Sequence, residues 1–278
     1  MRALVYDCSA GISGDMNLAA LIDLGVDRES LERELSKLHV HGEWKLECRR
    51  AQQSGIQGTR IDVLTVEEGH SGHGHAHHHR TMADIRRLIG ASGLSDAVKR
   101  TALSIFSLLA EAEAQVHGTT PEEVHFHEVG AVDSIIDITG AAICLELLRA
   151  DAVFTGPVEL GSGTVRCQHG TMPVPAPATA LLASRFQSTL NGTAHEATTP
   201  TGAAYIAALA RPVPAPLAGR ITGTGYGIGH RQGLPLPNIL RVMLVETEEQ
   251  ESSPELLTEL CANIDDMTPE QTAYLAEK

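Results

Sequence analysis

The chain has 278 residues, enough for one large hydrophobic core or two smaller ones. Its formal charge of -14, with no stripe of Lys and Arg, excludes a nucleic-acid partner, because phosphate-backbone binding requires clustered basic residues. Five scattered cysteines without a CxxC pair argue against a disulfide framework, and no apolar run is long enough to span a membrane, so we expect a cytoplasmic protein.

The first predicted element is a buried strand at residues 4–6, followed by a turn and by a helix that Gly25 ends. The turn, residues 7–16, is rich in small residues and hydroxyls, which favours an anion site at the helix start but equally suits an ordinary N-cap. We take Ser13 and Gly14 as candidate substrate-binding residues and Asp7 and Asp15 as candidate catalytic residues. The alternative role for Asp15 is to complement the helix dipole.

A second helix over residues 27–38 and a hairpin with strands at 44–50 and 59–66 are predicted next. Residues 69–80 then form a histidine-rich segment from which no packed element can be built, and we expect a mobile surface loop. Neutral imidazole binds Ni, Cu and Zn well, so this loop is a candidate metal collector, with a solvated spacer as the alternative. Its candidate ligands are His70, His73, His75, His77, His78 and His79.

Two more helices are predicted over residues 81–89 and 95–116, and Gly118 ends the second. Residues 120–123, Thr-Pro-Glu-Glu, have the pattern of a capping box with proline at the first helical position. This pattern predicts a further helix start.

The most informative stretch lies near the middle of the chain, at residues 125–137. If it is first extended and then helical, His125 and His127 share a face by the strand period, and Asp133 and Asp137 share a helical face by the four-residue period. Converging imidazoles and carboxylates suit Zn, Ni, Mn or Fe. With Glu128, these residues are the candidate fixed metal site; the alternative is a helix entry with capping carboxylates and half-exposed histidines.

Residues 152–160 are predicted to form a strand, and residues 161–177 an ordered excursion of the kind that often carries function. Within the excursion, Arg166 is placed to meet an anion. Cys167 and His169 share a face if the segment is extended, so His169 is a further candidate metal ligand.

A helix over residues 178–183 and a strand near 186–190 lead to Thr199, which is predicted to cap a helix that begins with Pro200 and ends near residue 210. Free N–H groups at that start make Thr199 and Thr201 candidate phosphate-binding residues, although an unliganded cap is equally consistent with the pattern.

The glycine-rich run at residues 220–230 has no helix after it, which excludes a dinucleotide or P-loop fingerprint. We predict a strand with close backbone approach, paired with residues 238–245. Several strands follow one another without an intervening helix. The predicted fold class is therefore α/β (α+β), with helices packed on a mixed, largely antiparallel sheet.

With these motifs assembled, the chain resembles the LarC family of nickel-inserting enzymes, which act in the synthesis of the nickel-pincer nucleotide cofactor. The resemblance rests on the turn after the first strand, the histidine-rich segment, the stretch at 125–137, and motifs at 170–177, 199–203, 225–230 and 262–270. Matches spread over the whole chain are far more specific than any one of them.

The resemblance implies a lyase-class enzyme that performs CTP-dependent cyclometallation. It places Ni(II) into pyridinium-3,5-bisthiocarboxylic acid mononucleotide and so makes the cofactor of lactate racemase-type enzymes. CTP with Mg or Mn is implied mainly on the family's C-terminal domain. A separate C-terminal-domain polypeptide and an oligomeric complete enzyme are further implications.

On this interpretation residues 1–246 are an N-terminal nickel-handling domain, residues 247–256 an acidic linker, and residues 257–278 the start of a truncated C-terminal domain. Two other functions stay open. The first is a nickel-binding chaperone or store without catalysis by this chain alone, and the second, which lacks an HExxH motif, is a metallohydrolase.

Overall fold

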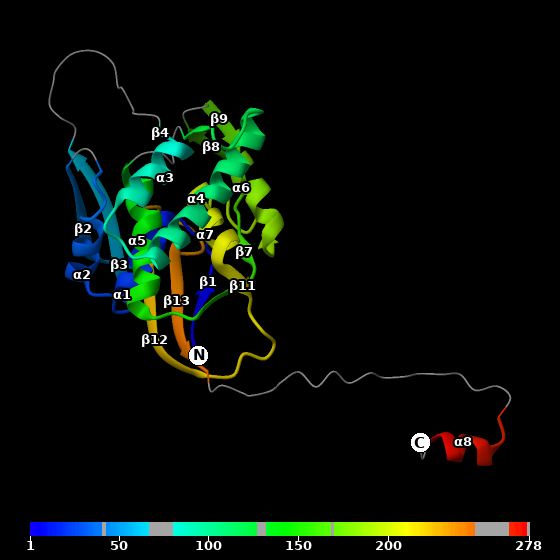
Figure 1. The fold of residues 1–278 in the computed structure, drawn as a ribbon. Coiled ribbons are helices and arrows are strands. Elements are labelled where there is room, and N and C mark those ends of the chain that lie inside the picture. Colours follow the sequence, from blue (N-terminus) through cyan, green and yellow to red (C-terminus); the bar gives the residue numbers. More distant parts are fainter. Residues whose placement is uncertain (41–42, 67–79, 127–131, 168–169, 248–266, 277–278) are drawn as a thin grey trace. The chain divides into compact units, whose positions relative to one another are not determined.

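The computed structural model describes residues 1–40, 43–66, 80–126, 132–167, 170–247 and 267–276. The chain divides into two units, Met1–Glu248 and Glu249–Lys278. The second unit contains the short helix α8 (Pro269–Ala276), and the first contains the other elements shown in Figure 1.

A mixed seven-stranded sheet in the order β11-β6-β1-β13-β12-β3-β2 forms the centre of the first unit. Antiparallel ladders join β1 to β13, β13 to β12 and β2 to β3, whereas β6 runs parallel to both β1 and β11, and β12 runs parallel to β3. The predicted mixed sheet with long antiparallel ladders is confirmed. Its strands are β1 (Arg2–Asp7), β2 (Glu43–Gln53), β3 (Ile56–Val66), β6 (Ala152–Thr155), β11 (Ala210–Pro212), β12 (Arg220–Ile228) and β13 (Ile239–Glu246).

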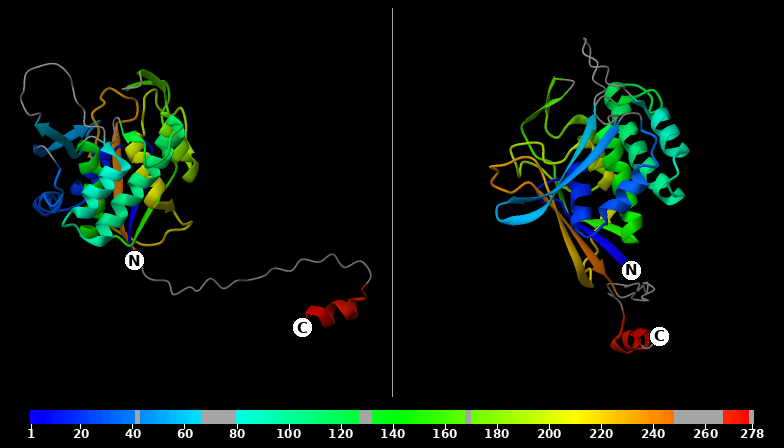
Figure 2. Two further views of the ribbon diagram at one scale, coloured as in Figure 1. Left: turned by 45° about the horizontal axis from the view of Figure 1, so that its top comes forward. Right: turned by 90° about the vertical axis from the view of Figure 1, so that its left-hand side faces the viewer.

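The helices of the first unit gather on one face of this sheet (Figure 2). Helices α1 (Gly14–Asp23) and α7 (Pro200–Leu209) contact the strands of the sheet. Helix α5 (Val132–Leu148) packs against α1 and α7, and α4 (Asp96–His117) packs against α5 and α7. Smaller helices are α2 (Arg28–Leu35), α3 (Met82–Ala91), α6 (Pro177–Leu182) and the 3-10 turn η1 (Ala183–Arg185). The predicted cap at Thr199 is confirmed, because its side chain accepts a hydrogen bond from a backbone N–H group. The side chains of Asp27, Thr81 and Ser95 cap α2, α3 and α4 in the same way.

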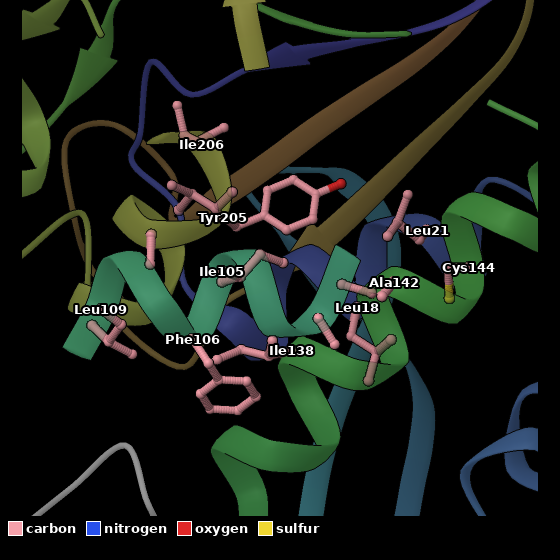
Figure 3. Packing of buried hydrophobic residues seen from close by; sticks show 14 of the residues in the cluster. Leu18, Leu21, Ile105, Phe106, Leu109, Ile138, Ala142, Cys144, Tyr205 and Ile206 are labelled. Atoms are coloured by element: carbon pink, nitrogen blue, oxygen red, sulfur yellow. The ribbon is translucent and has the colours of Figure 1, made fainter. Parts of the chain in front are cut away.

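The core lies between α1, α4, α5 and α7 (Figure 3). Leu18 of α1, Phe106 of α4 and Ile138 of α5 are buried there. Beneath α1 the glycines of β12 allow direct backbone contact, since a Cβ on Gly227 would lie 1.9 Å from the carbonyl oxygen of Met16. The predicted close backbone approach is therefore the place where α1 packs directly on β12.

Two predicted elements are wrong. Residues 120–123 form a single turn, because the Thr120 carbonyl accepts bonds from the N–H groups of Glu123 and Val124 and the chain then enters β5 (His125–Phe126), which pairs with β4 (Arg80–Thr81). The strand expected at 152–160 is two strands, β6 and β7 (Val158–Glu159), because Pro157 lacks the N–H that a continuous ladder requires.

The excursion at residues 161–177 contains the antiparallel pair β8 (Thr164–Cys167) and β9 (Gly170–Pro173), and β10 (Ser188–Thr189) pairs with β7. Within the described ranges, no helix has both the length and the apolar character needed to cross a membrane.

Candidate functional site

A cavity of about 710 Å³ lies in the first unit where several helices begin. The starts of α1, α5, α6 and α7 line it, together with the end of α4 and the pair β8–β9. Its volume is within the range of small-molecule sites. All four candidate substrate-binding residues are among its lining residues, namely Ser13, Gly14, Thr199 and Thr201.

The start of α1 reaches the cavity through the turn that follows β1. Gly11 has a φ of 83°, which glycine adopts readily, and its N–H donates to the carbonyl of Cys8 at 2.9 Å. Ser13 occupies the N-cap position, but its hydroxyl donates to the Asp15 carboxylate and makes no capping bond to the helix. The first N–H groups of α1 therefore have no cap from Ser13 and lie beside the cavity.

The start of α7 is tied directly to this turn. The N–H of Thr199 donates to the carbonyl of Ile12 at 3.1 Å, and the N–H of Ile12 donates to the Thr198 hydroxyl at 3.3 Å. A Cβ on Gly202 would lie 2.2 Å from the Ile12 carbonyl oxygen, so only glycine permits this contact. Two helix N-termini from distant parts of the sequence are thus held side by side at one cavity.

The first turns of α5 bring two predicted carboxylates to the same cavity. Asp133 is exposed, whereas Asp137 has a buried Oδ1 atom for which the described residues provide no hydrogen-bond partner. Burial, reinforced by the nearby carboxylates of Asp15 and Asp133, raises the pKa of Asp137 well above its ordinary value. A proton or a cation at this position would satisfy the carboxylate.

The candidate metal ligands are only partly covered by the structure. Within the residues it describes, no group of three or more His, Cys, Asp or Glu side chains is placed to hold a metal ion. His127, Glu128, His169 and the six histidines of the segment 69–80 lie outside those residues, and of His125 only the backbone, in β5, is described. The predicted fixed metal site therefore stays a prediction, with Asp133 and Asp137 at the cavity.

The two candidate catalytic carboxylates lie in different places. Asp15 lines the cavity, whereas Asp7, which the structure also describes, is not among its lining residues. Tyr6 faces the helices, and the two-residue strand period turns Asp7 to the opposite face, where it pairs with the guanidinium of Arg241. Burial opposes the shift, but hydrogen bonds from Ser9 and Arg241 hold the pKa of Asp7 below its ordinary value.

Several cavity residues were not singled out as site residues from the sequence. Glu113 and His117 come from the end of α4, with 3.5 Å between Oε2 and Nε2, and read as ordinary helix-end polar residues. Arg166 and Cys167 stood out as functional residue types within the excursion, whereas Met172 of β9 belongs to the motif at residues 170–177 but was given no role of its own. Arg166 is the one Lys or Arg among the described lining residues.

Comparison with known proteins gives one consistent result. A family profile described as "Nickel insertion protein" matches residues 4–278. The chain is 88% identical over 278 residues to the pyridinium-3,5-bisthiocarboxylic acid mononucleotide nickel insertion protein of Akkermansia muciniphila, covering 100% of this chain and 68% of that protein.

Proteins of the same name from two clostridia are more distant. The identity is 48% over 282 residues for Clostridium kluyveri and 46% over 304 residues for Clostridium acetobutylicum. The matches cover 100% of this chain in both cases, with 70% and 72% of the respective relatives. No solved structure matches the chain.

Proposed function

Because this chain belongs to the nickel insertion protein family, we propose that it inserts nickel into pyridinium-3,5-bisthiocarboxylic acid mononucleotide, the reaction for which its relatives are named. The observation that carries the proposal is the cavity at the helix starts, which offers an anion-binding end and an acidic end within one space of about 710 Å³. A mononucleotide with a metal ion presents both kinds of group.

The anion-binding end is the region where α1 and α7 begin. Backbone N–H groups and the positive ends of two helix dipoles favour a phosphate there. Ser13, Thr199 and Thr201 add hydroxyl groups at the same place, and Arg166 adds a positive charge to the cavity lining. We assign the phosphate of the mononucleotide to this end.

The acidic end is the start of α5. Nickel is the second substrate, and its ligands must be deprotonated to bind it. Asp137, whose buried Oδ1 has no partner among the described residues, and Asp133 would receive the ion as carboxylates. His125, His127 and Glu128 are proposed to complete the site, and the histidines of residues 69–80 to collect the metal.

We further propose that the reaction is a CTP-dependent cyclometallation of the lyase class. This assignment follows the family resemblance, and we assign CTP and its Mg or Mn ion to no described residue. The proposed linker at residues 247–256 agrees with the unit boundary between Glu248 and Glu249. The C-terminal domain beginning at residue 257, its supply as a separate polypeptide, and oligomer formation belong to the same proposal.

A nickel titration by calorimetry tests the acidic end. The chain is compared with an Asp133→Asn/Asp137→Asn double variant in which residues 69–80 are intact, and with Asp96→Asn, an exposed carboxylate in the first turn of α4, as matched control. We expect the double variant to lose one tight class of site and keep a weaker one, while Asp96→Asn behaves as the parent. Overlaying isotherms would contradict the fixed site and favour the nickel chaperone.

The chemical step is tested by supplying the mononucleotide, Ni(II), CTP and Mg to the chain and following the mass of the nucleotide. We expect an increase by one nickel ion less the protons released. Nickel binding with no increase in nucleotide mass under these conditions would contradict insertion by this chain.

A further inference from the structure

A continuous line of polar contacts leaves the cavity at Ser13 and ends on β2. The Ser13 hydroxyl donates to Oδ1 of Asp15, and Oδ2 of Asp15 lies 3.3 Å from Nε2 of His230. The same His230 nitrogen lies 3.2 Å from Oδ1 of Asp62, whose Oδ2 lies 3.0 Å from Nη2 of Arg49. Each carboxylate thus uses one oxygen for each neighbour, and the charges alternate along the line.

The backbone on both sides of His230 is held by two buried amide side chains. Nε2 of Gln53 donates at 2.8 Å to the carbonyls of both Gly229 and Arg231, and Oδ1 of Asn238 accepts from the N–H of Arg231 at 3.4 Å. Oε1 of Gln53 also accepts from the backbone N–H of Asn238 at 3.0 Å. Gln53 is 9% exposed and Asn238 is 6% exposed. Buried amides are stable only when they are hydrogen-bonded, and here they bond to the residues that flank His230.

The glycine before His230 is part of the same arrangement. The N–H of Gly229 donates to the Asn238 carbonyl at 2.9 Å, and a Cβ at Gly229 would lie 1.9 Å from Oδ1 of Asn238. His230 follows directly after this tight contact, so the fold fixes the place from which its ring reaches Asp15 and Asp62.

We propose that His230 is a positioning residue for the cavity: as an imidazolium it bridges Asp15 and Asp62, balances the Asp15 charge at the start of α1 and fixes the Ser13 hydroxyl, so that this end accepts an anionic ligand. Without it, Asp15 would place an uncompensated negative charge at the start of α1, where the phosphate is assigned, in a cavity that Asp133 and Asp137 already make acidic at its other end. The inference rests on the proposed function, because the anionic ligand is the mononucleotide.

The groups that face His230 favour its charged form. They are Asp15 from α1 and both Asp62 and Arg60 from β3. The hydrogen bond to Asp15 is the largest influence and raises the pKa of His230 together with the charges of Asp15 and Asp62, while burial and Arg60 oppose the shift. As pH rises through this raised pKa, the bridge loses its positive charge and the start of α1 becomes more negative.

The bridge itself is tested by nuclear magnetic resonance titration of the His230 ring in the whole chain and in its Asp15→Asn and Asp62→Asn variants. We expect each variant to lower the pKa of His230, and Asp15→Asn to lower it more. An unchanged titration in Asp15→Asn would overturn the proposal. This readout requires no ligand, so it decides the inference even if the proposed function fails.

The effect on the cavity is tested by calorimetry with nicotinic acid mononucleotide, which carries a pyridinium ring, a ribose phosphate and one carboxylate. Affinities are measured from about pH 6 to about pH 9 for the parent, His230→Gln and His230→Lys. At the lowest pH, we expect His230→Gln to bind the mononucleotide about tenfold more weakly than the parent and His230→Lys to keep the parent's affinity. As pH rises, the affinity of the parent should fall toward that of His230→Gln.

His39→Gln, an exposed histidine outside the cavity lining, is the matched control and should behave as the parent. A purely structural His230 would make Gln and Lys equally harmful, with no pH-dependent difference from the parent, and that result would overturn the proposal. If the parent binds no mononucleotide, the proposed function is contradicted and the ring titration alone decides the role of His230.

Discussion

Two carboxylates line the same cavity but differ in their hydrogen-bond partners. Both oxygens of Asp15, on the α1 side, are engaged, one by the Ser13 hydroxyl and the other by His230. On the α5 side, Oδ1 of Asp137 is buried without a partner among the described residues. Burial opposes the shift at Asp15, yet the bonds from His230 and Ser13 lower its pKa, whereas burial raises that of Asp137.

This difference separates two roles that the residue type alone cannot separate. Neighbouring carboxylates whose environments push their pKa values apart are a common arrangement in functional sites. The Asp15 side is fixed by its own contacts and is suited to orient a ligand. Among the described residues, the Asp137 side has no positive partner, and it is suited to receive a cation. The predictions below test this contrast, from the largest expected effect to the smallest.

The contact between the two sides depends on Gly14. A Cβ there would lie 2.6 Å from Oδ2 of Asp137, so Gly14→Ala should push α1 and α5 apart and lower the free energy of unfolding by ~1–3 kcal/mol, with loss of mononucleotide binding. Gly90→Ala in α3, where a Cβ meets nothing within 4 Å, is the matched control and should stabilise by up to ~1 kcal/mol. Urea unfolding measures both, and equal effects would contradict the close approach.

The two carboxylates should respond oppositely to amide substitution at neutral pH. Asp15→Asn weakens charged hydrogen bonds and should destabilise the fold by ~1–3 kcal/mol. Asp137→Asn replaces a buried carboxyl, whose ionised form is disfavoured by burial and by the neighbouring carboxylates, with a neutral amide, and should stabilise the fold by up to ~1 kcal/mol. Chemical unfolding of both variants gives the comparison, and the contrast fails if the two substitutions destabilise alike.

The pH dependence of stability should also differ between them. The folded pKa of Asp137 is raised, so its contribution is present below the ordinary pKa and is lost as pH rises through the folded value. The folded pKa of Asp15 is lowered, so its contribution is present above the ordinary pKa and is lost as pH falls through the folded value. Parent and Asp137→Asn should therefore diverge with rising pH, whereas parent and Asp15→Asn converge under acid conditions.

Urea unfolding at a series of pH values from about 3 to about 8 measures these differences, since both ordinary carboxyl values fall near the lower limit. A difference between the parent and Asp137→Asn that stays constant over this range would show that the Asp137 carboxyl titrates normally.

The smallest effect is expected for Asp7. Its carboxylate forms a partly exposed ion pair with Arg241 away from the cavity, and such pairs contribute ~0–1 kcal/mol. Asp7→Asn should leave nickel and mononucleotide binding unchanged in calorimetric titrations. A loss of either affinity would return Asp7 to the catalytic role that the sequence suggested.

Local features could be predicted from the sequence because local chemistry determines them. The cap at Thr199 depends on a neighbouring N–H group, and the common helical face of Asp133 and Asp137 depends on their spacing alone. The turn at residues 120–123 shows the limit, because the same capping pattern closes a single turn when the chain must enter a strand immediately afterwards.

The assembly of the site is a tertiary property. The sequence identified Ser13 and Thr199 separately, but their meeting depends on the contacts of Ile12 with Thr198 and Gly202. Nothing near His230 identifies Asp15 and Asp62 as its partners, since they come from α1 and β3. Tyr6, the residue before Asp7 in the same short strand, is buried toward the helices. Because successive side chains of a strand alternate between its two faces, Asp7 points away from the helices.

The central claim is that the mononucleotide binds where α1 and α7 begin. Amide hydrogen exchange of the whole chain, with and without nicotinic acid mononucleotide, tests it most directly, because bound phosphate would protect the N–H groups at residues 13–15 and at residue 201. We expect slower exchange at both helix starts and no change in α2. Binding without protection at these two starts would place the ligand elsewhere and contradict the account.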